Sequence, residues 1–315
     1  MRHIININRG WQFAKTAQNN AQDNVEWENI DLPHSWNAID GQDGGNDYYR
    51  GTARYVKTIE KAELPEADRY YLEIKGANSS ADVYLDGLHL AHHDGGYSTW
   101  RVDLTEHLSE KSLLSIEVDN AANDRVYPQM ADFTFYGGLY RNVNLICVNN
   151  VHFDVETWGT PGIHVTPIVE GEHAKVTVEA FVANQGDAQI RYTICDKEGN
   201  TVATAVTADT KAEFVIENPH LWQGIEDPYC YTCTATILEN GEPQDAVTVT
   251  YGYRSFRVDA ETGFYLNGKS LPLHGVARHQ DRLDKGWAIS KADHEEDIAL
   301  IKELGANTIR LAHYQ

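Results

Sequence analysis

The feature that most constrains this chain is a change of period near residue 288. Before it, β-branched and aromatic residues form short runs between turn clusters, and the dominant period is two residues. After it, one stretch carries apolar residues at helical spacing. Because a period of two is typical of β-strands, we expect a mainly β protein with a helix close to its end.

The first 150 residues are predicted to form a β-sandwich of jelly-roll type, because many short strands follow one another at regular spacing. Asp86-Gly87 separates Val83–Leu85 from Leu88–Leu90 and indicates a two-residue hairpin, whose type I′ turn needs positive φ at both central positions. The other strand candidates include Tyr55–Ile59, Tyr70–Ile74, Leu113–Val118 and Val143–Val148.

Residues 151–257 contain a second set of seven strand candidates. That number in about a hundred residues fits an immunoglobulin-like sandwich, although no suitably placed cysteine pair marks an antibody-type domain. The candidates are Ile163–Ile168, Lys175–Phe181, Ile190–Ile194, Thr201–Val206, Phe214–Ile216, Cys230–Leu238 and Ala246–Tyr251.

Residues 258–315 resemble the start of an α/β barrel. Ser290 can cap a helix over Lys291–Leu304 with Asp293 near the capping-box position, and Gly305 can end it in a left-handed conformation. Strand-like segments precede it (Ser270–Gly275) and follow it (Asn307–Ala312). Strand, helix and strand make a βαβ unit, which needs more parallel strands than this segment has, so we expect an incomplete (β/α)8 barrel.

Charge and composition exclude several classes of partner. The 315 residues carry 26 Lys and Arg against 47 Asp and Glu, a formal charge of −21, so nucleic acid and anionic membrane surfaces are unsuitable partners. No apolar run is long enough to cross a bilayer as a helix. Met1–Ile7 lacks signal-peptide features, which leaves open a cytoplasmic protein or one whose signal was removed.

The four cysteines do not form a recognisable disulfide or metal framework. Cys230 and Cys233 lie in a predicted strand, where positions three apart point to opposite faces, and no second pair completes a zinc site. His92-His93 beside Asp94 we interpret as an exposed loop rather than a metal site. The aromatic residues Tyr127, Phe133, Phe135 and Tyr136 we assign mostly to the sandwich core.

Five segments resemble landmarks of glycoside hydrolase family 2, the family of large β-galactosidases, β-glucuronidases and β-mannosidases. The resemblance runs the length of the chain, which would be a third to a half of a usual member. The most specific segment is the last, which departs from the family signature at Ala312 and Gln315. The segments are Asp31–Asn37, Val83–Gly87 with Gly95–Tyr97, Asp132–Arg141, His274–His279 and Asn307–Tyr314.

Arg278, His279, Arg310 and His313 are candidate sugar-binding residues. They lie in or just after predicted parallel strands, and barrel active sites are built at the carboxyl ends of such strands. Arginine and histidine can hold neutral sugar hydroxyls through hydrogen bonds. The alternative is that an arginine pairs with a nearby carboxylate and only stabilises the barrel mouth.

Asp132 is a candidate through the resemblance alone. An Asp at this place in the family reaches into the barrel's site and contacts the terminal sugar, or a monovalent cation beside it. The alternative is a carboxylate that caps a loop turn, which Asp does routinely.

The catalytic pair is expected outside this sequence. Retaining hydrolysis needs two carboxyl groups about 5–5.5 Å apart, and the resemblance places both glutamates on later barrel strands. The Glu-Asn pairs at Glu28, Glu217 and Glu239 fall in the β segments, and serine-nucleophile, phosphate-loop and zinc-protease signatures are missing.

We therefore expect the amino-terminal part of a retaining exo-acting β-glycosidase, inactive alone. The general resemblance of the barrel-entry segment Gly275–Trp287 favours a β-galactosidase, with β-glucuronidase or β-mannosidase as alternatives. A non-catalytic carbohydrate-binding protein is the competing hypothesis. The expected partner is a small carbohydrate such as a β-galactoside, and no cofactor is required. A monovalent or divalent cation in the complete active site, and homo-oligomerisation, stay open.

Overall fold

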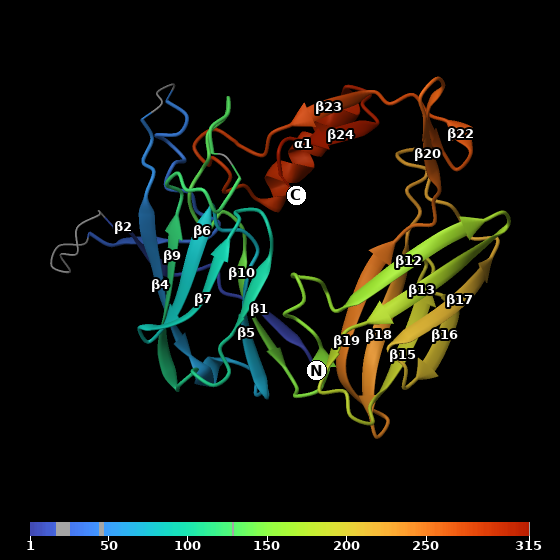
Figure 1. Ribbon diagram of the computed structural model, residues 1–315, viewed down its shortest axis with the longest axis horizontal. Helices are drawn as coiled ribbons and strands as arrows, with labels where there is room; N and C mark the ends of the chain where they lie inside the picture. Colours follow the sequence, from blue (N-terminus) through green and yellow to red (C-terminus); the bar gives the residue numbers. More distant parts are fainter. Residues whose placement is uncertain (17–25, 44–46, 128, 315) are drawn as a thin grey trace. The chain divides into compact units, whose positions relative to one another are not determined.

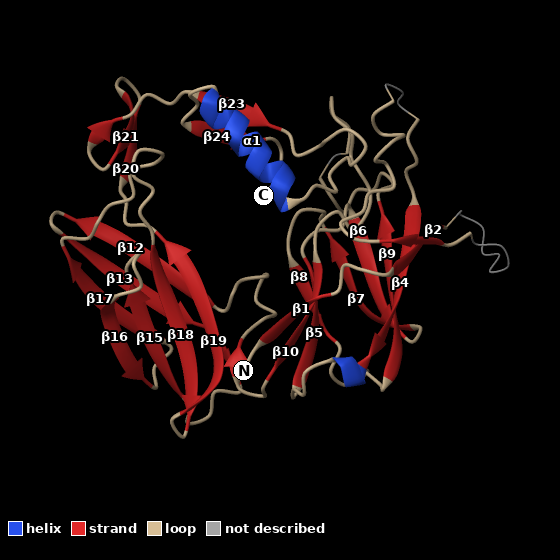
Figure 2. Cartoon of the chain, turned by 180° about the vertical axis from the view of Figure 1, so that it is seen from behind, coloured by secondary structure: helices blue, strands red, loops and turns tan. Residues whose placement is uncertain are grey.

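The computed structural model describes residues 1–16, 26–43, 47–127 and 129–314, which divide into two compact units. One unit comprises Met1–Arg2, Val148–Val276 and Lys302–Ile309, and the other comprises His3–Cys147, Ala277–Ile301 and Arg310–Gln315. Strands predominate, as the ribbon in Figure 2 shows, so the predicted mainly β fold is confirmed. The domain boundaries expected at residues 150 and 257 stay predictions.

The unit that begins at His3 contains a β-sandwich of two antiparallel sheets (Figure 1). A short 3-10 helix, η1 (Lys61–Glu63), connects two of its strands. The larger sheet has the order β3 (Glu28–Ile30), β2 (Trp11–Lys15), β4 (Thr52–Glu60), β9 (Lys111–Asp119), β6 (Ser80–Leu85) and β7 (Leu88–Asp94). The smaller sheet has the order β1 (His3–Asn6), β10 (Val143–Val148), β5 (Arg69–Ile74) and β8 (Trp100–Asp103).

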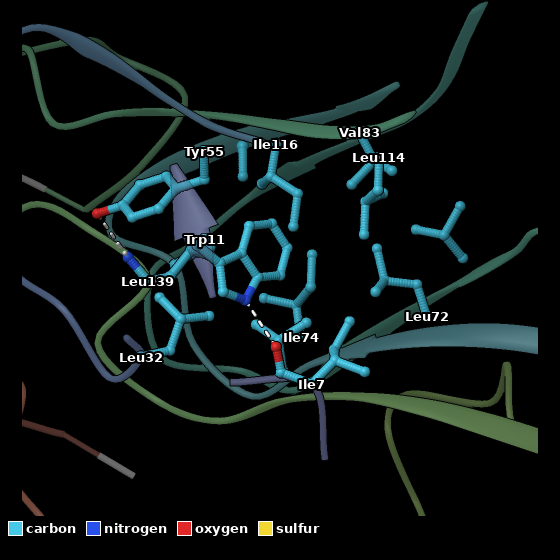
Figure 3. Packing of buried hydrophobic residues seen from close by; sticks show 14 of the residues in the cluster. Ile7, Trp11, Leu32, Tyr55, Leu72, Ile74, Val83, Leu114, Ile116 and Leu139 are labelled. Atoms are coloured by element: carbon cyan, nitrogen blue, oxygen red, sulfur yellow. Dashed lines mark hydrogen bonds between the residues drawn. The ribbon is translucent and has the colours of Figure 1, made fainter. Parts of the chain in front are cut away.

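Alternating side chains from both sheets fill the sandwich core (Figure 3). Trp11 is fully buried, and its indole Nε1 donates to the Ile7 carbonyl oxygen at 2.7 Å, so its one polar atom is satisfied. The backbone amide of Leu139 donates to the Tyr55 hydroxyl at 3.4 Å. Each such large side chain contributes roughly 1.5–3 kcal/mol through burial, so this core holds the sandwich together.

Residues Asp86 and Gly87 connect β6 to β7 as the sequence predicted. Their φ angles are 51° and 83°, both in the left-handed region that a type I′ turn requires. His92 and His93 lie within β7 rather than in the expected loop, so that interpretation was wrong. Both residues pair with β6 across the sheet, and this register is not visible in the local sequence.

The other unit contains the immunoglobulin-like sandwich, and all seven predicted strands are present in it. The arginine of Met1–Arg2 joins this unit, because Arg2 Nη2 lies 2.9 Å from the buried Asp245 carboxylate. One sheet has the order β12 (Ile163–Glu170), β13 (His173–Ala180) and β17 (Lys211–Glu217). The other has the order β16 (Thr201–Thr207), β15 (Gln189–Cys195), β18 (Tyr231–Glu239) and β19 (Glu242–Tyr251), and β11 (His152–Phe153) pairs with β14 (Val182–Ala183).

A small sheet that the sequence analysis missed follows this sandwich. It contains β20 (Phe256–Asp259), β21 (Gly263–Leu266) and β22 (Lys269–Ser270). Asn267-Gly268 forms the turn with φ angles of 49° and 78°, and this dipeptide was the available signal. The expected strand over 270–275 begins later, because Pro272 has no backbone N–H to donate to a sheet.

The βαβ unit is present as β23 (Gly275–Arg278), α1 (Lys291–Glu303) and β24 (Thr308–Leu311), seen together in Figure 1. Asn307 N donates to His274 O and Ala312 N donates to Arg278 O, so β23 and β24 run in the same direction. Gly305 follows α1 with φ of 76°, the left-handed stop expected from the sequence.

Two further sequence predictions can be compared with the described residues. No described helix is long and apolar enough to cross a membrane. All four cysteines are free thiols, and Cys233 is buried within β18 while Cys230 comes just before that strand.

Candidate functional site

The loop between β23 and α1 is held by a capping box at the start of the helix. The Ser290 amide and hydroxyl both donate to Asp293 Oδ2 at 2.7 Å, and the Asp293 amide donates back to Ser290 Oγ at 3.3 Å. Lys285 Nζ lies 2.8 Å from Asp293 Oδ1. The hydrogen bond from Lys285, followed by those from Ser290, lowers the pKa of Asp293 strongly. The predicted cap is confirmed, and it fixes where the helix begins.

Arg278, the last residue of β23, is buried against α1. Its Nε donates to Asp297 Oδ2 at 2.7 Å, its Nη1 donates to the Tyr314 hydroxyl at 2.5 Å, and its Nη2 lies 3.1 Å from His294 Nδ1. Its side chain is only 8% exposed. This placement fits the alternative of an arginine paired with a carboxylate, and the sugar contact of Arg278 stays a prediction.

Asp297 is the carboxylate that neutralises this arginine. Burial would raise the pKa of Asp297, but hydrogen bonds from Arg278 and Arg282 outweigh burial and lower it. Burial, followed by the Arg278 charge, lowers the pKa of His294. The ion pair between Arg278 and Asp297 is costly to break, because removing one partner would leave the other charge partly buried and unpaired.

His279 is exposed, although it directly follows Arg278. Its ring lies 5.6 Å from the Phe133 ring and 5.7 Å from the His313 ring, the latter at an interplanar angle of 85°. Phe133 is also 5.4 Å from His313. Three rings from the sandwich, from the end of β23 and from the segment after β24 therefore meet, and we call them the Phe133 cluster.

Arg310 contacts the Phe133 cluster, and Asp132 is the neighbour of Phe133 in the chain. Arg310 Nη2 lies 3.1 Å from His313 Nδ1, and both side chains are exposed. Asp132 is exposed and directly precedes Phe133 in the chain. Of the five predicted site residues, the structure places His279, Arg310 and His313 together and turns Arg278 to the helix, while Asp132 is exposed and its role stays a prediction.

Phe133 is the residue that the sequence analysis missed. It had been assigned with its neighbours to the core, where Phe135 and Tyr136 do lie. Phe133 itself is only partly buried, and no pattern in the sequence distinguishes it from them. Its place directly after the candidate Asp132 was the one available signal.

The sandwich loop and the segment after β23 are joined by an aromatic and polar contact within the same unit. Tyr136, Tyr140 and Trp287 form a small buried cluster. Gln42 Nε2 donates to the Tyr136 hydroxyl at 3.1 Å and to the Arg282 carbonyl oxygen at 2.7 Å. These contacts fix two of the three segments that supply rings to the Phe133 cluster, the sandwich loop and the segment after β23.

Gly286 is needed at this contact. Its φ is 54°, and a Cβ there would lie 2.5 Å from the Tyr136 ring. A larger residue would therefore push the two segments apart.

A cavity of about 250 Å³ lies next to the Arg278 network. Gln280 is 4% exposed, and among the described residues its Nε2 has no hydrogen-bond partner. The cavity is lined by Tyr140, Arg141, Gln280, Trp287, Ile289, His294 and Tyr314.

The Phe133 cluster offers hydrogen-bond donors and acceptors beside an aromatic ring, which suits a polyhydroxylated ligand. The described residues contain no group of three or more His, Cys, Asp or Glu that could hold a metal ion. The Glu-Asn pairs at Glu28, Glu217 and Glu239 lie in strands β3, β17 and β18 of the sandwiches, as expected.

Three models of glycosyl hydrolase family 2 match successive parts of the chain. The galactose-binding domain-like model matches residues 46–137, the central model matches residues 161–254 and the TIM barrel model matches residues 257–315. The chain belongs to glycoside hydrolase family 2.

Individual relatives carry two activity names. A β-glucuronidase of Bacteroides fragilis is 35% identical over 99% of this chain and 46% of its own length. A β-galactosidase of Bacteroides ovatus is 30% identical over 99% of this chain and 38% of its own length. The crystal structure of an FMN-binding β-glucuronidase from Faecalibacterium prausnitzii L2-6 superposes with a TM-score of 0.94 at 42% identity, covering all of this chain and 49% of that one. The family 2 chain thus spans about half the length of these relatives, or less.

Proposed function

We propose that the complete protein is a retaining exo-acting β-glycosidase and that the chain described here supplies one wall of its sugar pocket. The supporting observation is the Phe133 cluster, in which a sandwich loop meets residues at the ends of two parallel barrel strands. Active sites of barrel enzymes lie at that end of the strands. Family membership supports hydrolysis as the reaction.

In this proposal the pocket residues bind and orient the terminal sugar. Asp132 accepts hydrogen bonds from sugar hydroxyls, while His279, His313 and Arg310 donate to sugar oxygens. The partly exposed Phe133 ring packs against the apolar face of the pyranose. No cofactor enters the proposed chemistry.

Bond cleavage is assigned to two carboxyl groups outside residues 1–315. One would protonate the leaving oxygen, and the other would attack the anomeric carbon to form a glycosyl-enzyme that water then hydrolyses. We therefore expect the 315-residue chain alone to hydrolyse neither an aryl β-galactoside nor an aryl β-glucuronide.

The sugar at this pocket has two candidates. The segment Gly275–Trp287 favours a β-galactoside. A β-glucuronide is the second candidate, because the relatives that are 35% and 42% identical are both named β-glucuronidases. Comparing kcat/KM of the complete protein on the two aryl glycosides decides between them.

Substitution of Phe133 tests the pocket itself. In the complete protein, Phe133→Ala should lower kcat/KM about fivefold, since aromatic packing of this kind is worth about 1 kcal/mol. Phe256→Ala is the matched control, because Phe256 is also exposed but belongs to the small sheet β20–β22, and it should leave kcat/KM unchanged.

Two results would contradict the proposal. Unchanged kcat/KM in the Phe133→Ala enzyme would show that the Phe133 ring does not contribute to the sugar pocket. A complete, folded protein that hydrolyses no β-glycoside would instead favour the carbohydrate-binding hypothesis.

A further inference from the structure

The solvent face of the larger sheet carries a second cavity, which shares no residue with the Phe133 cluster. Its volume is about 330 Å³, within the range of small-molecule sites. Strands β4, β9, β6 and β7, neighbours in Figure 1, form its floor, and the segment 121–125 forms one side. Its floor residues are Thr52, Ser80, Asp82, His92, Glu117 and Asp119.

Strand register places polar side chains in two adjacent rows across these four strands. Both rows lie on the face opposite the core, because the residues between them along the strands, such as Ala53, Val118 and Ala81, are buried. The first row is Arg54, Glu117, Asp82 and His92. The second row is Thr52, Asp119, Ser80 and Asp94.

This arrangement is not one that folding requires. Asp82 and Glu117 are direct cross-strand partners, and like charges directly opposite one another destabilise a sheet. An outward face is free to carry neutral or alternating residues instead. The two facing carboxylates are kept together by the basic side chains that flank them in the same row, Arg54 and His92.

Neighbouring cations balance most of the negative charge. Arg54 Nε donates to Glu117 Oε1 at 2.9 Å, and His92 Nδ1 lies 3.0 Å from Asp82 Oδ1. Arg125 Nε donates to Asp94 Oδ2 at 3.1 Å. Three of the four carboxylates in the two rows therefore have a basic partner, and Asp119 is held by hydrogen bonds instead.

The segment beside the cavity is held in place before any ligand arrives. Asp119 Oδ1 accepts from the Ala121 amide at 2.6 Å, and Asp119 Oδ2 accepts from the Thr52 hydroxyl at 2.5 Å. Asn123 Oδ1 accepts from the Arg125 amide at 3.0 Å. A site built in advance loses less entropy when it binds.

We propose that this cavity is a binding site for a neutral sugar unit, separate from the hydrolytic pocket. Donors such as Arg125 and Asn123 alternate with the carboxylate acceptors, and a sugar hydroxyl can both donate and accept.

Saturation-transfer NMR on the 315-residue chain tests this proposal, with galactose, glucose and mannose as separate probes. We expect one or more of them to bind with a Kd of about 0.1–5 mM. Glu117→Gln keeps the side-chain shape and Asn123→Ala leaves the ion pairs intact, and each should weaken binding at least tenfold. His313→Ala should leave this binding unchanged, because it alters only the Phe133 cluster.

Glu60→Gln is the matched control. Glu60 also lies on β4 and pairs with a lysine of β9, Lys111, at 3.3 Å, but it does not line the cavity. Thermal melting of each variant confirms that it is folded.

Any of four outcomes would overturn the proposal. The first is that none of the three sugars shows saturation transfer to folded protein at 20 mM (about four times the weakest expected Kd). The second is binding that Glu117→Gln and Asn123→Ala leave unchanged, and the third is binding that His313→Ala abolishes. The fourth is a calcium titration that shifts the resonances of the cavity residues while the sugars do not, which would replace the proposal with a cation site. The proposal does not depend on hydrolysis, so it can fail or succeed independently of the glycosidase assignment.

Discussion

At the scale of single residues, burial changes what a side chain can do. Arg278 and His279 are neighbours in the sequence, yet the first is closed into an ion pair with Asp297 and the second stays exposed beside Phe133. Alternation along an extended segment separates them, since successive side chains point to opposite sides. One of them is therefore available to a ligand and the other is not.

His34 leads to a prediction about pH. Its Nδ1 lies 2.9 Å from the Tyr55 hydroxyl, and burial, followed by the nearby Lys15 charge, lowers the pKa of His34 to about 4. Between pH 6.5 and 4 the unfolded chain binds a proton here that the folded chain does not. The free energy of unfolding should therefore fall as the pH falls through this range, by up to about 3 kcal/mol, and stay constant above it.

Urea unfolding followed by tryptophan fluorescence, at pH 7.5 and pH 4.5, measures this effect. His34→Gln removes the titrating group, so its unfolding free energy should depend less on pH than that of the parent chain. His107→Gln alters an exposed histidine of the same unit and serves as the control. Equal pH dependence in the parent and His34→Gln proteins would refute the assignment.

At the scale of elements, local signals were sufficient wherever the determinant lies within a few residues. The Asp86-Gly87 turn, the seven strands of the second sandwich and the cap of α1 all followed from patterns of that length. Asn267-Gly268 carried an equally strong signal that was overlooked. The strand before α1 was placed too early, since boundaries depend on pairing with a distant strand.

The cap of α1 supports a second prediction. Ser290→Ala removes the hydroxyl that bonds the Asp293 amide and carboxylate, which should cost about 1 kcal/mol. Hydrogen exchange should show roughly fivefold faster opening of the first turn of α1. Ser290→Thr should restore the protection, and Ser255→Ala, at an exposed loop serine, should not change it. Unchanged exchange in Ser290→Ala would show that packing alone holds the helix start.

At the scale of the whole chain, the barrel start exposes apolar surface. Ile298, Leu300 and Leu311 are 48%, 54% and 49% exposed. Ile301 and Ile309, on the same helix and on the following strand, are only partly covered. In the complete protein we propose that the remaining barrel elements cover this face.

The chain alone should therefore self-associate as its concentration rises, because exposed apolar surface is buried between copies. Ile298→Lys should reduce that association in sedimentation velocity experiments. Leu88→Lys is the control, because Leu88 is 50% exposed at the β6–β7 hairpin, away from the barrel start. A monodisperse monomer at all concentrations would contradict this prediction.

The sequence alone determined the kinds of element, their order, the hairpin and helix signals and the family resemblance, because all of these depend on residues close together in the chain. Only the tertiary structure decided that Phe133 meets His279 and His313, and that Asp82 faces Glu117 across two strands. These contacts join residues tens to more than a hundred positions apart. They depend on strand register and on packing between segments, which no local period encodes.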